Sequence, residues 1–244
     1  MPDMKPPRRI WNFNRIVGIS SNHTSIYEAQ TIQQMAFIRS IMKEQRKNEL
    51  YDIRLDDLEA VVFDLETTGF SPHNGDEIIS IGAIAVKGKQ MLEEEKFYTI
   101  VNPNREVPHH IVHLTGITND MVQVAPKLID ALSRFLEFVS RRTLIAHGTG
   151  HDKLFLNSAL WKTSRVNLSH RMLDTMMIAK WLLPRLENYT LDTLLKAFGI
   201  HITDRHHAFE DSFMTAQLWS KFLEEIHAQQ IDTLGDLYEK MSFR

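Results

Sequence analysis

The sequence contains no cysteine among its 244 residues, which excludes disulfide bonds and metal sites built on thiolates. Any metal ion must therefore be held by aspartate, glutamate, histidine or backbone oxygen. The sequence also lacks a run of about 18 apolar residues, the length that a membrane helix needs. No apolar segment of the kind found in secretory signals follows the basic residues near the N-terminus. We therefore expect a cytoplasmic protein that contacts no membrane.

The composition is that of a globular protein with a large core, because 43% of the residues are hydrophobic and 24% are charged. The net charge of −3 is unevenly distributed along the chain. Residues 1–50 carry eight basic and four acidic side chains, whereas the remainder carries 20 basic and 27 acidic ones. A basic segment joined to an acidic body could contact a polyanion, or it could form the solvated face of a helix.

The first 57 residues are predicted to form an N-terminal appendage to the main domain. Residues 1–20 contain three prolines and mixed charges, which predicts an irregular arm. Ser25 and Glu28 then have the spacing of a helix capping box. Apolar residues recur after them at helical spacing: Ile32, Met35, Ala36 and Met42. This pattern predicts an amphipathic helix over residues 25–46, whose apolar stripe packs on the main body or on a partner.

The rest of the chain predicts an α/β fold. Three apolar segments separated by short turns predict an antiparallel meander of strands, at residues 61–63, 77–86 and 97–101. A further strand and several helices then alternate: the strand at 143–146, and helices at 128–139, 152–161, 174–183, 190–198, 208–226 and about 231–241. This order is typical of a mixed central sheet flanked by helices. We place the main domain at residues 58–228 and a C-terminal helix at 229–244.

Two acids stand at the end of the first predicted strand. Asp64 and Glu66 are two residues apart, so their side chains point to the same face of the strand. Each carboxylate raises the pKa of the other and resists losing its hydration. A bound divalent cation such as Mg²⁺ or Mn²⁺ removes this cost. The alternative is that both acids lie in solvent at a strand end, and the pair alone does not decide between the two.

Two further acids follow histidines at the same spacing. Asp152 lies five residues after His147, at a strand–helix junction where it could equally cap the helix. Asp211 lies five residues after His206 and four after His207, inside a predicted helix. Each acid has a structural explanation when taken singly. Together with the first pair, they form an ordered set of four acids and a histidine.

This set resembles the DnaQ-like family of 3′→5′ exonucleases, in the DEDDh subgroup that has four acids and a histidine and includes the proofreading epsilon subunit of bacterial DNA polymerase III. Three motifs carry the resemblance, at residues 63–69, 147–152 and 206–211. Two further segments are similar, at residues 76–83 and 113–118. In the second motif the family usually has Asn after its His and an aromatic residue before its Asp, where this sequence has Gly148 and His151. The resemblance spans about residues 58–225.

The resemblance implies a ribonuclease-H-like fold and hydrolysis of phosphodiester bonds with two divalent ions, Mg²⁺ or Mn²⁺. Carried over by motif position, four acids would hold the ions: Asp64, Glu66, Asp152 and Asp211. His206 would take the proton from the attacking water, because the spacing to Asp211 selects it over His207. The substrate would lie against four residues: Glu66, Thr67, Thr68 and His147.

The substrate implied by the resemblance is a single-stranded 3′ end, with DNA favoured, and the product is a nucleoside 5′-monophosphate. Three alternatives stay open: an exoribonuclease, a phosphodiesterase acting on small nucleotides, and a binding or scaffold protein that retains the fold. A polymerase or another protein could dock through residues 1–50, and a nuclease acting alone fits the sequence equally well.

Overall fold

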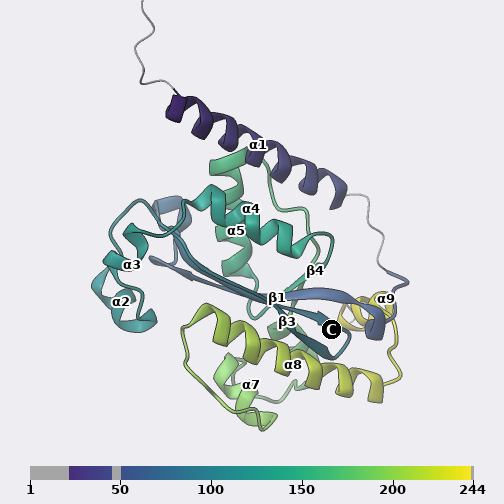
Figure 1. Cartoon of the computed structure of the whole chain (residues 1–244). Helices are drawn as coiled ribbons and strands as arrows, with labels where there is room; N and C mark the ends of the chain where they lie inside the picture. The colour runs from purple at the N-terminus through teal and green to yellow at the C-terminus, as the bar shows by residue number, and fades with distance from the viewer. Residues whose placement is uncertain (1–21, 46–50, 243–244) are drawn as a thin grey trace, which may run out of the picture.

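The computed structural model describes residues 22–45 and 51–242, and these form a five-stranded sheet with helices on both faces (Figure 1). The strand order is β3-β2-β1-β4-β5. The strands are β1 (Glu59–Thr67), β2 (Ile78–Lys87), β3 (Gln90–Ile100), β4 (Thr143–Ala146) and β5 (Met172–Asp174). The first three strands pair antiparallel, while β4 and β5 run parallel to β1. The predicted mixed sheet and its antiparallel meander are therefore confirmed.

The helices cover the two faces unequally. In chain order they are α1 (Asn22–Gln45), α2 (His109–Thr115), α3 (Asn119–Gln123), α4 (Leu128–Val139), α5 (Gly150–Ser164), α6 (Thr175–Leu182), α7 (Leu191–Ala197), α8 (Ala208–Ala228) and α9 (Leu234–Ser242). Short 3₁₀ turns lie at Leu55–Asp57 and Pro72–Asn74. Figure 1 shows α4 and α5 above the sheet with α1 packed on them, and α7 and α8 below it.

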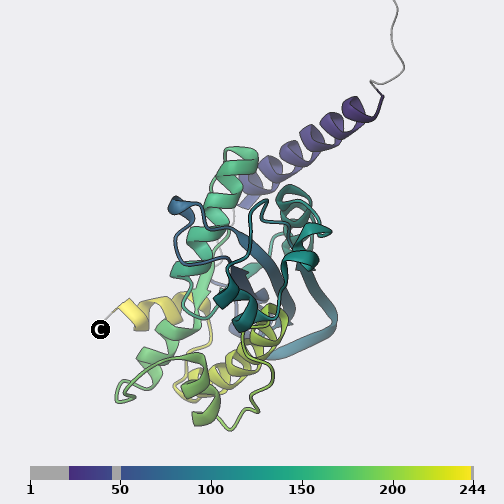
Figure 2. The ribbon, with the colours of Figure 1, turned by 90° about the vertical axis from the view of Figure 1, so that its left-hand side faces the viewer.

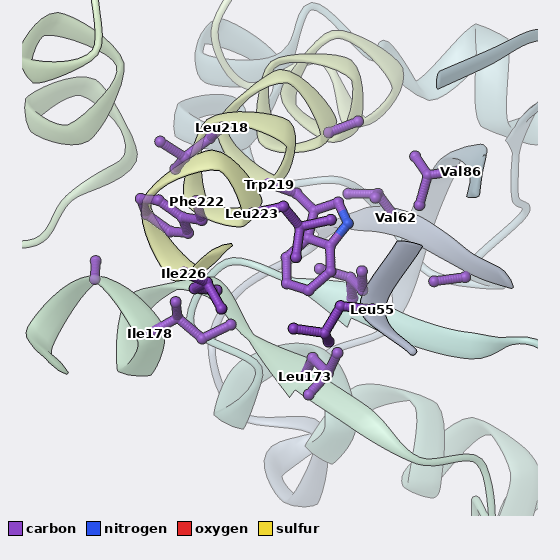
Figure 3. Packing of buried hydrophobic residues seen from close by; sticks show 14 of the residues in the cluster. Leu55, Val62, Val86, Leu173, Ile178, Leu218, Trp219, Phe222, Leu223 and Ile226 are labelled. Atoms are coloured by element: carbon purple, nitrogen blue, oxygen red, sulfur yellow. The ribbon is translucent and has the colours of Figure 1, made fainter. Parts of the chain in front are cut away.

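Each face of the sheet has its own hydrophobic core, because successive side chains of a strand point to opposite faces. Val61, Phe63 and Leu65 of β1 pack with α4 and α5, whereas Ala60 and Val62 pack with α8. Figure 3 shows the second core around the fully buried Trp219 of α8, whose indole N–H donates to the Gly88 carbonyl at 3.0 Å. Asp64 and Glu66 continue the row of Ala60 and Val62, so they face α8.

A glycine brings α8 onto the sheet beside these acids. Gly82 of β2 pairs with Asp64 of β1. A Cβ atom at Gly82 would lie 2.2 Å from the backbone carbon of Ala208 and from the backbone nitrogen of Phe209. The first turn of α8 therefore packs directly against the backbone of β2. This close approach brings Asp211, in that first turn, toward the acids of β1.

The N-terminal helix forms, but it begins earlier than expected. α1 begins at Asn22, so Ser25 lies inside the helix and the predicted capping box is wrong. Ile38 and Met42 are buried against α4 and α5. The second half of α1 thus packs on the main body, while its first half projects away from it (Figure 2). The irregular arm predicted for residues 1–20 lies outside the described residues.

Some elements differ from their predicted bounds. β3 begins at Gln90, seven residues before the predicted start at 97. It is an edge strand and includes the acidic run 93–95, and charged residues are common on edge strands. The three-residue β5 and the short helices α2 and α3 were not expected. Within residues 22–45 and 51–242, no helix combines the length and apolar character of a bilayer span.

The segment before β1 and the C-terminal helix are joined. The Leu55 N–H donates to the Asp232 carbonyl at 2.8 Å, and Arg54 forms an isolated bridge with Thr233. α9 then packs on the α8 core through Leu234. The predicted divisions of the chain at residues 57 and 228 stay predictions.

Candidate active site

The four predicted acids meet where three elements begin or end. β1 supplies Asp64 and Glu66, the first turn of α5 supplies Asp152, and the first turn of α8 supplies Asp211. Burial raises the pKa of Asp64 well above its ordinary value, and the nearby carboxylates of the other three acids raise it further. The structure therefore gathers four residues that are far apart in the sequence.

The other acids of this cluster are also buried. Burial raises the pKa of Glu66 to about 8, and the Asp211 carboxylate adds to this rise. Burial also raises the pKa of Asp152. Carboxylates this close keep their protons unless a cation balances their charge. The cluster thus has the electrostatic character of a site that favours a bound cation.

The donor atoms fit a divalent cation. Glu66, His206 and Asp211 offer ligand atoms that all lie within 4.8 Å of one another. Asp211 Oδ1 is buried and forms an ion pair with Arg205 Nη1. Carboxylate oxygens supplemented by an imidazole suit Mg²⁺ and Mn²⁺. The described residues therefore form a site that could hold such an ion.

The two adjacent histidines have different surroundings. His206 has a left-handed backbone (φ 63°), and its N–H donates to Asp211 Oδ2 at 3.1 Å. The ring of His207 instead accepts a hydrogen bond from the Glu210 N–H at 3.4 Å, capping α8, and stacks on Tyr98 with ring centroids 4.7 Å apart. His207 is thus engaged in structural contacts, while His206 is the histidine beside the acids.

Asp174 fixes the start of α5, a role that its place in the sequence does not indicate. Its carboxylate accepts hydrogen bonds from the N–H groups of Gly148 and Thr149 at 3.0 and 2.9 Å and from the Thr149 hydroxyl at 3.0 Å. It also caps α6 through the Met176 N–H at 2.9 Å. An acid at the start of a predicted helix was the available signal. These bonds fix the turn from which Asp152 projects.

Gly148 explains one departure from the family motif. Its backbone is left-handed, with φ 73°. Glycine adopts this conformation without a steric penalty, and asparagine is the next most tolerant residue. Gly148 therefore satisfies the same backbone requirement as the asparagine that usually stands at this place in the second motif.

Most of the side chains predicted to bind substrate make hydrogen bonds that stabilise the local structure. The ring of His147 lies 2.9 Å from both the Thr175 hydroxyl and the Tyr189 carbonyl, and its burial lowers its pKa. Thr67 donates to the Gly69 carbonyl at 2.6 Å, and Thr68 donates to Asp76 at 3.1 Å. Contact with a substrate by the two threonines would then use their backbone. The substrate-binding roles of these residues stay predictions.

His151 accounts for the second departure. Its ring lies between Phe70 and Phe155, at centroid distances of 6.0 and 4.6 Å. His151 thus stands where the family usually has an aromatic residue, and its ring packs against aromatic rings there. Phe70, on the loop that follows β1, is 79% exposed. An accessible aromatic surface thus lies beside Asp152 and Glu66.

We expect the metal-free protein to become less stable as pH rises. Glu66 has an ordinary pKa of 4.5, and the fold raises it to about 8. Between these values the unfolded chain releases the proton that the folded chain retains, so the free energy of unfolding falls with rising pH. Urea unfolding in EDTA between pH 5 and 8 measures this slope. Glu66→Gln should flatten it, and identical slopes for the two proteins would contradict the prediction.

Comparison with known proteins decides the family. The model of the RNase_T exonuclease family matches residues 61–219, a range that includes all three motifs. The chain belongs to this exonuclease family. The predicted membership in the DnaQ-like exonucleases is thereby confirmed, as is the ribonuclease-H-like fold.

Two relatives are polymerase proteins. The chain is 38% identical over 182 residues to DNA polymerase III PolC-type of Bacillus subtilis strain 168, which covers 74% of this chain and 12% of that protein. It is 32% identical over 205 residues to the DNA polymerase III subunit epsilon-like protein of Rhodobacter capsulatus, covering 83% of this chain and 29% of the relative. The chain thus spans a small part of these proteins.

Solved exonuclease structures share the fold. The nuclease domain of 3′hExo, a DEDDh family member bound to rAMP, has a TM-score of 0.60 at 20% identity, over 71% of this chain and 92% of that one. E. coli Exonuclease I in complex with a dT13 oligonucleotide has a TM-score of 0.59 at 17% identity, over 71% of this chain and 43% of that one. At these identities the likeness concerns the fold.

Proposed function

We propose that this protein is a 3′→5′ exonuclease that uses two divalent ions, Mg²⁺ or Mn²⁺, to release nucleoside 5′-monophosphates from single-stranded 3′ ends. The observation that carries the proposal is the gathering of four acids, three of them buried, and His206 at one site, in a chain of an exonuclease family. A scaffold protein would have no reason to keep four mutually repelling carboxylates together. The clustered acids therefore favour catalysis over a binding role.

In this proposal the acids hold the ions, and His206 moves the proton. When bound, two divalent ions stabilise the attacking and leaving oxygens of an in-line displacement. Asp64, Glu66, Asp152 and Asp211 would hold them. His206 takes the proton from the attacking water, because it is the histidine that lies beside the acids. Its backbone hydrogen bond to Asp211 keeps its position fixed relative to the cluster.

The surface beside the acids suits an unpaired end. Phe70 offers an exposed ring on which a base could stack, and stacking contributes about 1–3 kcal/mol per base. A terminal nucleotide needs few phosphate contacts, so the acidic body is no obstacle. The oligonucleotide bound to Exonuclease I supports DNA as the substrate. The rAMP bound to 3′hExo supports RNA as the second candidate.

The proposal extends to location and partners. The polymerase relatives support a role in the cytoplasm next to a polymerase. The second half of α1 already packs on the body, so a partner docking through residues 1–50 would meet the first half of this helix, where Ile32 is 65% exposed. A nuclease that acts without a polymerase is compatible with the same site.

A digestion assay tests the proposed function. Single-stranded DNA and RNA of matched sequence, labelled at the 5′ end, are incubated with the protein and Mg²⁺ or Mn²⁺. We expect a ladder that shortens from the 3′ end, release of 5′-monophosphates, and complete loss of cleavage in EDTA. Metal-independent cleavage, or none on either polymer, would contradict the proposal. Faster RNA digestion would select the ribonuclease alternative, and strong competition by mononucleotide esters would indicate a small-molecule phosphodiesterase.

A further inference from the structure

Arg205 reaches from the protein surface into the acidic cluster. It precedes His206, and its side chain is only 24% exposed. Its Nε donates to Asp192 Oδ1, in the first turn of α7, at 2.5 Å. Its Nη1 forms an ion pair with Asp211 Oδ1. The guanidinium therefore joins an accessible acid on α7 to a buried acid of the candidate metal site.

The contact between Arg205 and Asp211 lies in the protein interior. Both Arg205 Nη1 and Asp211 Oδ1 are buried, so the guanidinium and carboxylate charges pair away from solvent. The positive charge of Arg205 also opposes the rise in the pKa of Asp64 and of Glu66. Arg205 thus acts on three of the four acids: Asp211, Asp64 and Glu66.

The pair with Asp192 does not explain this placement by itself. The Asp192 side chain is 49% exposed, and exposed ion pairs contribute little to stability. Burying a guanidinium is costly unless its charge is compensated. That compensation comes from the carboxylate cluster, whose oxygens are also the atoms suited to a divalent ion.

We propose that Arg205 is a built-in counter-cation of the acidic cluster, occupying Asp211 Oδ1 when no divalent ion is bound and displaced from it when one binds. The proposal rests on the metal site of the proposed function. Asp192 retains the arginine near the site after displacement, so the exchange is reversible. Arg205 is then a positioning residue that stabilises the metal-free protein and lowers its affinity for metal.

Titration of the full chain with Mn²⁺ alone, followed by calorimetry, tests this role without any substrate. We expect Arg205→Gln to lower the Kd for Mn²⁺ about tenfold, since removing a partly buried opposite charge changes carboxylate equilibria by at least this factor. The Tm of the metal-free variant should fall, and Mn²⁺ should raise it more than in the wild type. Arg141→Gln is the matched control, because Arg141 pairs with Glu44 at the surface and is 71% exposed. Its Kd should equal that of the wild type.

Arg205→Lys keeps the test usable if the glutamine variant does not fold. Lysine retains the charge but cannot contact Asp192 and Asp211 with a planar fork, so its Kd should fall between those of the wild type and the neutral variant. An unchanged or higher Kd in the folded Arg205 variants would overturn the role of Arg205 while leaving the metal site intact. Absence of Mn²⁺ binding in the wild type would instead contradict the metal site itself.

Discussion

Replacing His206 with asparagine should lower kcat by about 10²–10⁴-fold, the usual contribution of a positioned general base. We expect the same replacement at His207 to change kcat by no more than a few-fold. Asparagine is suitable at both places, because it tolerates the left-handed backbone of His206 and is a good N-cap in the place of His207. The pair of variants therefore compares one chemical change at adjacent positions.

The comparison separates catalysis from stability. Loss of the stack between His207 and Tyr98 should reduce the stability of His207→Asn without removing the base. Steady-state kinetics on a short DNA oligomer, together with urea unfolding of both variants, measures the two effects. Equal losses of kcat would show that the loop as a whole is needed, and a larger loss at His207 would reverse the assignment. Imidazole added to His206→Asn should restore part of the rate.

The sequence was sufficient to predict the residues whose chemistry is unusual for their place in the chain. Asp64 and Glu66 end the apolar row of β1, and the structure brings them together with Asp152 and Asp211 as expected. The choice of His206 over His207 as the base stays a prediction. The long helices were also predicted, because their apolar residues recur with a clear period. Gly199, which follows the C-terminal end of α7, has the left-handed backbone typical of a glycine that ends a helix.

Residues whose role depends on contacts between distant elements were not predictable. In the sequence Asp174 marks only the start of a predicted helix, and the fold shows that it also holds the turn before Asp152. Arg205 is one of many basic residues, and its meaning depends on the position of Asp192 in α7. The predicted capping box at Ser25 was wrong because the spacing of Ser25 and Glu28 does not mark the start of the helix. α1 begins earlier, at Asn22. Short elements such as β5 depend on the sheet that surrounds them.

Gly82→Ala should be the most damaging of the small substitutions outside the acidic cluster. The added methyl group would lie 2.2 Å from backbone atoms of Ala208 and Phe209. A flexible side chain could rotate to relieve such a clash, but backbone atoms cannot. The first turn of α8 must then move away from β2. Overpacking of this kind costs typically 1–3 kcal/mol, and we expect about 3 kcal/mol here. Urea unfolding of the purified variant measures this loss.

The same displacement should reduce activity, because the shifted turn contains Asp211 and follows His206. A misplacement of about 1 Å costs roughly 10²-fold in rate, so kcat should fall even where the variant is fully folded. Gly150→Ala is the matched control: Gly150 begins α5, close to Asp152, yet a Cβ there meets no atom within 4 Å. That variant should be as stable as the wild type or up to about 1 kcal/mol more stable. A Gly82→Ala protein with wild-type stability and kcat would show that α8 tolerates movement, and that the close approach at Gly82 does not set the geometry of the site.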